Sequence, residues 1–413
     1  MCKNCPVGLT IWSHRVLGVE GNLQMDGIIN VYKEKGYTSH DVVARLRGIT
    51  GERHIGHTGT LDPAAAGVLP MCLGTATKAC ELLTDKGKEY ETVLLLGIET
   101  NTEDATGEIV SVGDVTGITD DMIMEAVKSF EGDIEQIPPM FSATRINGMR
   151  SYDLARQGVS IDRSAKKIHI ESIDIISDIT RCLLSEKEKF KPSKDSMLAK
   201  FVEEPDPEEG RWHWENNDIR KDENKDISVI RLALRISCEK GTYIRTICAD
   251  IGKKLGCGGC MERLLRTRSG EFSIAESHSL AELEEIFNKT KNSCNDETIK
   301  YLTECIPENG GKCENENDAF DAVQNSHIKM QTDVLISADR CFMEYPALHC
   351  KEKYDSVLNN GNLMRMRHFK EYIEVPDAVN RVYDSKNEFK ALYEWVETRK
   401  LYKPVKVFIS IKE

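Results

Sequence analysis

The chain has 413 residues and a formal net charge of −13 at pH 7, with 40% hydrophobic and 30% charged residues. This length exceeds a single average core and predicts two domains. No apolar run approaches the roughly eighteen residues of a membrane-spanning helix, and no long apolar core suggests a secretory signal. The fourteen cysteines are scattered through a lysine- and glutamate-rich chain, which favours reduced thiols and a cytoplasmic location.

The negative charge is concentrated in two stretches. Residues 185–227 hold 13 acidic and 9 basic residues, and residues 281–330 hold 11 acidic and 5 basic residues. Basic residues gather elsewhere, at positions 145–167 and 240–268. Because a polyanion responds to the local field, the overall negative sign does not exclude an RNA partner. A solvated charged surface is the alternative interpretation of these basic clusters.

Residues 1–24 show no hydrophobic period and are expected to be either a disordered extension or a mis-assigned start. Cys2 and Cys5 form a lone C-x2-C pair, whereas a zinc site needs four ligands, so we expect no metal there. The first convincing element is a buried strand at Gly27–Tyr32. A turn then leads to an amphipathic helix that we expect Ser39 to cap.

The next stretch, Gly56–Lys78 (GHTGTLDPAAAGVLPMCLGTATK), has neither a helical nor a strand period. It contains a histidine, His57, and a single carboxylate, Asp62, among two prolines and four glycines. We interpret it as a shaped loop, and such loops on rigid scaffolds commonly carry functional groups. Asp62 could act as a nucleophile or an acid–base group, or it could only cap a turn. The residue types leave both interpretations open.

Regular elements are expected after this stretch. Residues 185–227, which are densely charged and poor in apolar residues, are interpreted as a flexible and dispensable surface insertion between two paired strands. Trp212 and Trp214 within it could contact RNA or anchor the loop locally. The expected elements are a helix at Ala76–Leu83, strands at Lys88–Ile98 and Glu108–Val112, helices at Ile118–Phe130 and Ser151–Gln157, and strands at Lys167–Ile176 and Arg231–Cys238.

The remaining chain is expected to continue as helices, strands and a terminal module. Cys257 and Cys260 form a second C-x2-C pair, which we interpret as structural rather than as a redox or zinc site. Residues 288–340 are acidic and are expected to form a linker. The other elements are a helix from the Gly241 turn to Gly256, a short helix at Met261–Arg266, a strand at Thr267–Ile274, a helix capped by Ser279 and ending at Phe287, and a β-rich module at residues 341–413.

Several catalytic motifs are absent from the sequence. It contains no phosphate-cradling G-x-x-x-x-G-K-[ST], no G-x-G-x-x-G after a strand, and no H-E-x-x-H. G-x-S-x-G is also missing. These motifs supply the anion-binding backbone, metal ligands or nucleophile of the corresponding enzymes. Their absence disfavours nucleotide hydrolysis, dinucleotide cofactors and zinc peptidase chemistry.

The Gly56–Lys78 stretch resembles the signature of the TruB family of pseudouridine synthases. Further stretches resemble the other motifs of this family in the same order, and together they span about residues 27–278. The sequence departs from the family pattern at Tyr32-Lys33-Glu34, where the family often has Asp-Lys-Pro. The further matching stretches are Gly27–Gly48, Lys88–Thr92, Gln136–Tyr152, Gly241–Asp250 and Arg266–Phe272.

The resemblance implies a fold and a function. The fold is α+β, with a mixed, mostly antiparallel sheet flanked by helices in residues 25–287 and a PUA-like module in residues 341–413. The implied reaction is isomerisation of uridine to pseudouridine at position 55, in the T-loop of tRNA. It implies no cofactor, no metal, no protein partner and a monomer. Rival interpretations are a guide-RNA-dependent synthase acting on ribosomal RNA and a non-catalytic RNA-binding or tRNA-folding protein.

The resemblance also assigns site residues. Asp62 matches the catalytic aspartate, which either attacks the nucleotide or removes a sugar proton. Tyr90 matches the tyrosine that stacks on the target base. Tyr243 and Arg245 match the active-site pair of a strand, in which the arginine pairs with the aspartate. The remaining matches are His57, which helps to hold the flipped nucleotide, and Lys33, the basic residue of the opening turn.

Overall fold

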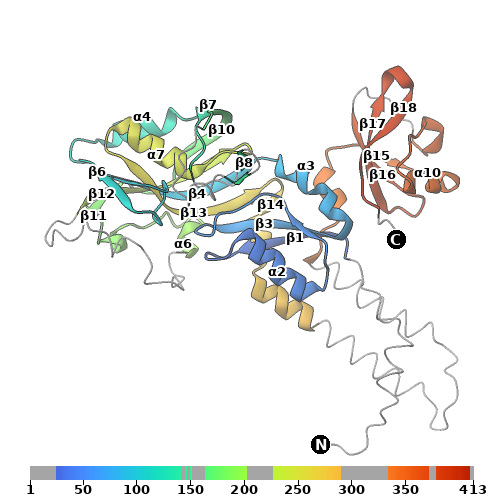
Figure 1. Ribbon diagram of the computed structural model, residues 1–413, viewed down its shortest axis with the longest axis horizontal. Coiled ribbons are helices and arrows are strands. Elements are labelled where there is room, and N and C mark those ends of the chain that lie inside the picture. The colour runs from blue at the N-terminus through green and yellow to red at the C-terminus, as the bar shows by residue number, and fades with distance from the viewer. Residues whose placement is uncertain are drawn as a thin grey trace, which may run out of the picture.

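The computed structural model describes residues 25–140, 145–146, 149–150, 163–201, 227–289, 334–371 and 378–409. The expectations for residues 1–24, for the helix at Ser151–Gln157, for Trp212 and Trp214, and for most of the acidic linker lie outside these ranges. Within the described ranges, no helix is long and apolar enough to cross a membrane. Figure 1 shows a body built on one long sheet, with a smaller C-terminal module beside it.

The body is organised around a ten-stranded sheet. Its pairings are antiparallel except for the parallel contact between β13 and β3, which confirms the expected mixed, mostly antiparallel sheet. Three short strands pair with strands of the main path: β2 (Ile55–His57) with β3, β11 (Thr180–Leu183) with β12, and β14 (Phe272–Ser273) with β13. The order along the main path is β1 (Gly27–Lys33), β3 (Ala66–Leu73), β13 (Gly259–Ser269), β4 (Lys88–Leu96), β12 (Ser228–Cys238), β10 (Lys166–Ile175) and β7 (Gly132–Gln136).

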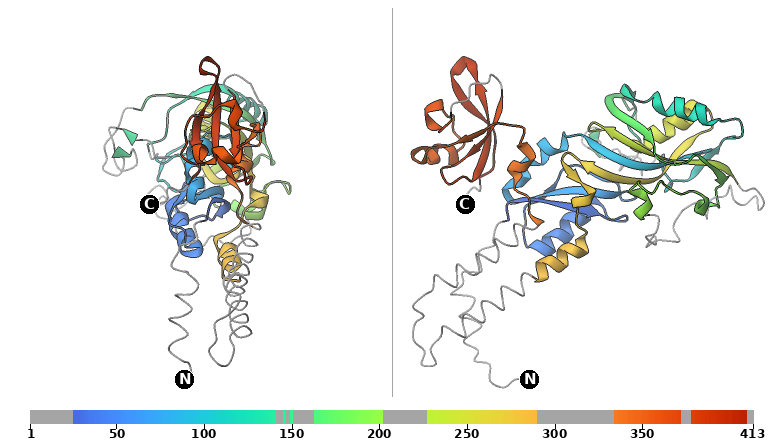
Figure 2. Two further views of the ribbon diagram at one scale, coloured as in Figure 1. Left: turned by 90° about the vertical axis from the view of Figure 1, so that its right-hand side faces the viewer. Right: turned by 180° about the vertical axis from the view of Figure 1, so that it is seen from behind.

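Helices flank both halves of this sheet (Figures 1 and 2). Helices α4 and α7 pack over β4, β10 and β12, and α2 and a helix at residues 280–289 pack against β1 and β3. Ser279 caps this last helix as expected, because its Oγ accepts the N–H of Glu282 at 3.2 Å. The other helices are α2 (Ser39–Thr50), α3 (Cys80–Thr84), α4 (Asp120–Lys128), α6 (Leu198–Phe201) and α7 (Ile244–Leu255).

Two small hairpins complete the body. β5 (Ile98–Thr100) pairs with β6 (Ile109–Val112), and β8 (Arg145–Ile146) pairs with β9 (Met149–Arg150). The turn between β5 and β6 follows directly from the end of β4. This turn carries Asp104, whose carboxylate lies 3.5 Å from the guanidinium of Arg245.

The prediction that Ser39 caps α2 is wrong, because Thr38 does so. Thr38 Oγ1 accepts the N–H of Asp41 at 3.1 Å, and the Asp41 carboxylate accepts the N–H of Thr38 at 2.8 Å. This reciprocal arrangement is a capping box. Ser39 is buried, and its Oγ accepts the N–H of Leu61 at 3.1 Å. The adjacent Thr and Ser are both good caps, so residue type alone did not decide between them.

The interpretation of Gly56–Lys78 as one continuous loop is also wrong. Ala66–Leu73 forms β3, which lies inside the sheet between β1 and β13. Its side chains are buried on both faces, so the strand reads as a continuous apolar run instead of an alternation. Pro70, a residue that central strands seldom contain, obscured it further. The irregular loop therefore shrinks to residues 58–65, which still include Asp62.

The short helix predicted at Met261–Arg266 is a strand. This segment belongs to β13, which pairs with β4 along most of its length. Short apolar runs of this kind do not distinguish a strand from a buried helix by period alone. Cys257 and Cys260 consequently lie at a helix-to-strand connection instead of a turn between two helices.

The expected pairing of the strands near residues 170 and 235 is confirmed, because β10 pairs with β12. The expectation of a flexible surface insertion is wrong for its described part. Phe190 and Leu198 are buried in one cluster with Val93, Ala233 and Leu265 of the sheet. Residues 185–201 thus cover part of the sheet, with their apolar side chains turned inward.

The C-terminal module has its own sheet, in the order β15 (Ala347–His349), β16 (Val379–Tyr383), β17 (Phe389–Val396) and β18 (Leu401–Val407), with α10 (Asp355–Asn359) beside it. It meets the body through an apolar cluster that joins Phe342, Leu392 and Phe408 to Ile28 and Val68. Residues at the end of the expected linker take part, since Ile336 exchanges backbone hydrogen bonds with Ile28 at 2.7 and 2.8 Å.

Gly67 provides a test of the packing between β3 and β13. Its φ is +118°, and a Cβ at this position would lie 2.2 Å from the carbonyl oxygen of Arg266. We expect Gly67→Ala to lower the free energy of unfolding by about 2 kcal/mol or more, because both the backbone and its neighbour would be strained. Urea unfolding followed by circular dichroism would measure the change.

The matched control is Gly48→Ala, at an exposed position of α2 where a Cβ would meet nothing within 4 Å. This change should raise the free energy of unfolding by roughly 0.5–1 kcal/mol, since alanine is the better helix former. Equal effects of the two substitutions would contradict the account.

Candidate active site

The loop at residues 58–65 connects β2 to β3 and is held in shape by a buried guanidinium. Arg266, only 1% exposed, donates from Nε to the carbonyl of Val68 at 2.7 Å. Its terminal nitrogens donate to the carbonyls of Gly59 and Thr60 at 3.3 and 3.4 Å. From the other side, Ser39 binds the backbone of the loop at Leu61. The loop is therefore fixed between α2 and β13.

Asp62 stands at the centre of this loop, and the turn expected as one interpretation of this residue is observed. A turn is present, because the N–H of Ala65 donates to the carbonyl of Asp62 at 3.0 Å. The carboxylate of Asp62, however, accepts a hydrogen bond from Arg245 Nη2 at 2.6 Å. The turn thus presents the side chain toward α7.

Arg245 lies between two carboxylates. Its Nη1 is 3.5 Å from Asp104 Oδ2, and its own side chain is 8% exposed. Asp104 is itself fixed, because its Oδ1 accepts the hydroxyls of Thr102 and Thr106 at 2.9 and 2.5 Å. Such charge-assisted bonds are the strong ones in proteins. The orientation of the guanidinium toward Asp62 is therefore well defined.

The prediction that Tyr243 and Arg245 share a strand is wrong. Tyr243 is the N-cap residue of α7, and Arg245 lies in the first turn of that helix. The carbonyl of Tyr243 accepts Gln136 Nε2 at 3.0 Å, and its N–H donates to Gln136 Oε1 at 2.9 Å. This pair of bonds attaches the start of α7 to the end of β7.

A cavity of about 220 Å³ opens beside Asp62. Tyr90, buried on β4, contributes to its wall together with Tyr243 and Arg245. Four of the six residues singled out from the sequence are thus gathered at one cavity. Its lining is Gly59, Thr60, Leu61, Asp62, Thr84, Lys88, Tyr90, Lys240, Gly241, Thr242, Tyr243, Ile244, Arg245, Met261, Leu264 and Arg266.

The other two singled-out residues do not line this cavity. Lys33 is fully buried at the end of β1, where its Nζ donates to the carbonyls of Glu34 and Tyr37 at 3.0 and 2.7 Å. Burial lowers the pKa of Lys33 to about 7, with the charge of Asp62 opposing the shift. His57 lies on β2 at the base of the loop, and its Nδ1 accepts the N–H of Gly59 at 3.4 Å. His57 thus bonds to the start of the loop, whereas Lys33 bonds to the turn after β1.

Three basic residues at the cavity were not selected as site residues from the sequence: Lys88, Lys240 and Arg266. Lys88 and Arg266 both belong to stretches quoted for the family resemblance, but the residue pattern marked them only as charges. Lys88 Nζ donates to the carbonyls of Thr84 and Lys86 at 2.8 and 2.7 Å, and burial lowers the pKa of Lys88 to about 8, aided by Arg266. With Lys240, these side chains place three cations at the cavity wall.

The surroundings of Asp62 shift the pKa of its carboxylate in opposite directions. Its side chain is 40% exposed and lines the cavity. Burial by the surrounding protein raises the pKa of Asp62 above its ordinary value, while Arg245 acts against the rise and Asp104 adds to it. Arg245 is thus the main group that favours the ionised form.

In the part of the chain that the structure covers, no group of three or more His, Cys, Asp or Glu residues could hold a metal ion.

Comparison with known proteins agrees with this geometry. Residues 47–186 match the TruB family pseudouridylate synthase N-terminal domain, and residues 245–307 match the tRNA pseudouridylate synthase B C-terminal domain. The tRNA pseudouridine synthase B of Lachnoclostridium phytofermentans is 38% identical over 93% of this chain and 100% of its own length. That of Clostridium acetobutylicum is 34% identical over 89% of this chain and 95% of its own.

Solved structures share the fold at lower identity. The chain superposes on a structure of an H/ACA RNP bound to a substrate RNA with a TM-score of 0.52, at 20% identity, covering 95% of this chain and 87% of the other. A Cbf5-Nop10-Gar1 complex gives the same TM-score at 21% identity and the same coverage. Identity at this level supports the fold alone, whereas the full-length relatives define the family. The chain belongs to the TruB family of pseudouridylate synthases.

Proposed function

We propose that this protein isomerises uridine to pseudouridine at position 55, in the T-loop of tRNA, with Asp62 as the catalytic carboxylate. The observation that carries the proposal is the 2.6 Å ion pair between Asp62 and Arg245 at the wall of a cavity that Tyr90 also lines. The names of the relatives, which are 34–38% identical over nearly their whole length, favour tRNA as the substrate.

The reaction needs few groups. The bond between C1′ and N1 of the uridine breaks, the base turns, and a bond forms between C1′ and C5. N1 gains a proton and C5 loses one, so there is no net oxidation and the reaction calls for no redox cofactor. A single carboxylate suffices, either as a nucleophile toward the nucleotide or as a base toward a sugar proton. Asp62, oriented by Arg245, is placed for either role.

The target base must leave the stacked loop to reach Asp62. Enzymes that act on a base pay for this unstacking and recover part of the cost within the pocket. Tyr90 offers an aromatic ring for the flipped uracil, and stacking of this kind contributes roughly 1–3 kcal/mol. Lys88, Lys240 and Arg266 give the cavity the positive charge that suits the adjoining phosphates.

Two observations favour tRNA pseudouridine synthesis over a guide-RNA-dependent synthase and over a protein that only binds RNA. The structures of H/ACA complexes share the fold at 20–21% identity, whereas the full-length relatives carry the name of a tRNA enzyme. A protein that only binds RNA has no need of a carboxylate held by a buried arginine at a cavity wall. We further propose that the protein acts as a cytoplasmic monomer without a protein partner. The nine cysteines of the described part are all free thiols, in keeping with a reducing compartment.

Asp62→Asn tests the catalytic assignment. We expect the change to reduce pseudouridine formation in unmodified tRNA by roughly 10³-fold or more, because the amide can neither attack nor accept a proton. Pseudouridine mapping would measure position 55 directly. Asp121→Asn, at an exposed position of α4, is the matched control and should match the wild type. Activity of Asp62→Asn, or the lack of a T-loop product from the wild type, would refute the proposal.

The charges around Asp62 predict opposite pH shifts for two variants. Arg245 lowers and Asp104 raises the pKa of Asp62. If the ionised carboxylate is the active form, Arg245→Gln should move the acidic limb of the kcat/KM profile to higher pH. Asp104→Asn should move it to lower pH. Steady-state rates with a T-arm RNA across the acidic range would show both shifts. Limbs that shift in the same direction would rule out this electrostatic arrangement.

A further inference from the structure

Strand β4 presents different side chains to its two faces. Tyr90 lines the cavity, and Leu94 and Leu96 belong to the same core cluster as Tyr90, beneath α4 and α7. Because side chains alternate along a strand, the next residue, Glu91, points the other way. Glu91 is only 1% exposed, and Val93 packs on this second face. The position of Tyr90 therefore depends on what supports the strand from behind.

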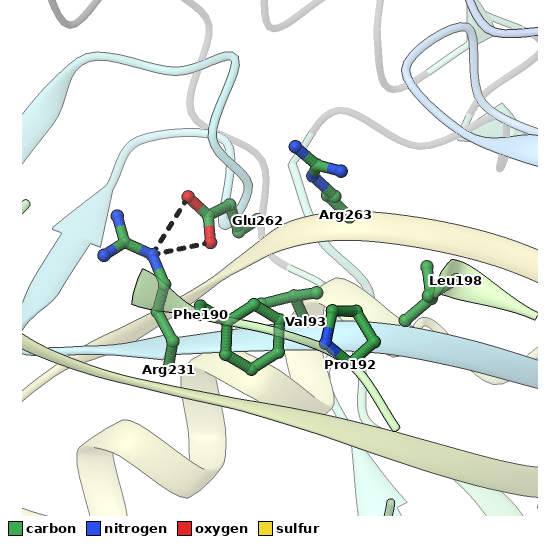
Figure 3. Close-up of a pocket in the computed structure, with 7 residues that line it drawn as sticks. All are labelled: Val93, Phe190, Pro192, Leu198, Arg231, Glu262 and Arg263. Carbon is green, nitrogen blue, oxygen red and sulfur yellow. Dashed lines mark hydrogen bonds and ion pairs between the residues drawn. The ribbon is translucent and has the colours of Figure 1, made fainter. Parts of the chain in front are cut away.

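Residues 185–201 cover this second face. Phe190 and Leu198 are buried against Val93, and the same cluster includes Ala233 of β12 and Leu265 of β13. Figure 3 shows the side chains of the segment lying along these strands beside Val93. The cavity left between them is about 30 Å³, so the contact is nearly filled. The segment thus rests on all three central strands.

The segment is also bonded to the buried carboxylate of Glu91. Glu91 Oε2 accepts the hydroxyl of Ser196 at 2.7 Å and the N–H of Leu198 at 3.0 Å. Its Oε1 accepts Arg235 Nη2 at 2.8 Å. A buried charge is costly unless it is paired and hydrogen-bonded. The segment therefore supplies two of the four hydrogen bonds to Glu91, and Arg235 supplies the other two.

A second buried charge anchors the start of the segment. Arg231 of β12 donates from Nε to both oxygens of Glu262, at 3.0 and 3.3 Å, as the dashed lines of Figure 3 mark. Its other nitrogens donate to the carbonyls of Leu183 and Leu184 at 3.3 and 3.0 Å. The chain is thus fixed to β12 and β13 directly before it crosses β4.

We propose that residues 185–201 form a brace that positions β4, and with it Tyr90, for the reaction. Here the brace means this segment, with Ser196 and Leu198 as its positioning residues. The inference rests on the proposed function, because it assigns Tyr90 a part in catalysis. It also reverses the expectation that residues 185–227 are dispensable, at least for their first seventeen residues.

Leu198→Ala tests the brace, with Leu198→Met as the conservative variant and Lys194→Ala, at an exposed site of the same segment, as the control. We expect Leu198→Ala to lower the single-turnover rate at saturating tRNA about tenfold, since small displacements of positioning groups are costly. The Kd for tRNA should change less than about twofold, because Leu198 lies behind the sheet. Both comparison variants should stay within about twofold of the wild type.

Ser196→Ala removes a bond to Glu91 without removing bulk, so it tests the same idea if Leu198→Ala does not fold. Its single-turnover rate should fall about three- to tenfold. A double-mutant cycle with Tyr90→Leu then separates positioning from general support. On that background, the substitution at position 198 or 196 should have almost no further effect on the rate. Full additivity with Tyr90→Leu, or an unchanged rate in the folded single variants, would overturn the proposal.

Hydrogen exchange gives a readout that does not require activity. Peptides covering β4 should exchange at least about threefold faster in Leu198→Ala than in the wild type, while peptides covering β16 to β18 should not change. Equal exchange of β4 in both proteins would also overturn the brace. If the wild type forms no pseudouridine yet β4 responds in this way, the proposed function fails and the mechanical link survives. The two ideas can therefore fail separately.

Discussion

The ion pair between Arg245 and Asp62 is the interaction on which the rest of the site depends. Its members lie 183 positions apart in the chain, one in the first turn of α7 and one in the loop before β3. It therefore forms only when that helix docks beside the loop. Asp104 holds the guanidinium from behind at 3.5 Å. Because removal of Asp62 would leave the buried guanidinium of Arg245 without its nearest carboxylate, the fold and the site are coupled.

The sheet makes this pairing possible by fixing both partners on rigid elements. Arg266 of β13 ties down the backbone of the loop, and the parallel contact of β3 with β13 is close enough that only glycine fits at position 67. β4 carries Tyr90 into the same cavity and is supported from behind through Glu91. Buried charged groups within the strands, Arg266 of β13 and Glu91 of β4, thus fix the elements that surround the site through their hydrogen bonds.

Periodicity predicted β1, β4, α4 and α7, since each has one clear apolar face or a strongly apolar run. It failed at β3, where Pro70 argued against a central strand, and at β13, where the short apolar run at 261–266 does not distinguish a strand from a helix. The pairing of Arg245 with Asp62 came from family resemblance, because periodicity carries no information on contacts between distant segments. Lys88 and Arg266 were missed as cavity residues, since a basic side chain in a sequence does not reveal whether it faces a cavity or solvent.

The central claim is that the carboxylate of Asp62 meets the sugar of a uridine stacked on Tyr90. The most direct measurement is a crystal structure of the Asp62→Asn variant bound to a T-arm RNA that contains the target uridine. The account predicts that the side chain at position 62 lies about 3–3.5 Å from the ribose of that uridine, as a near-attack geometry requires. A target uridine that remains stacked in its loop, or a flipped base outside the cavity, would contradict it.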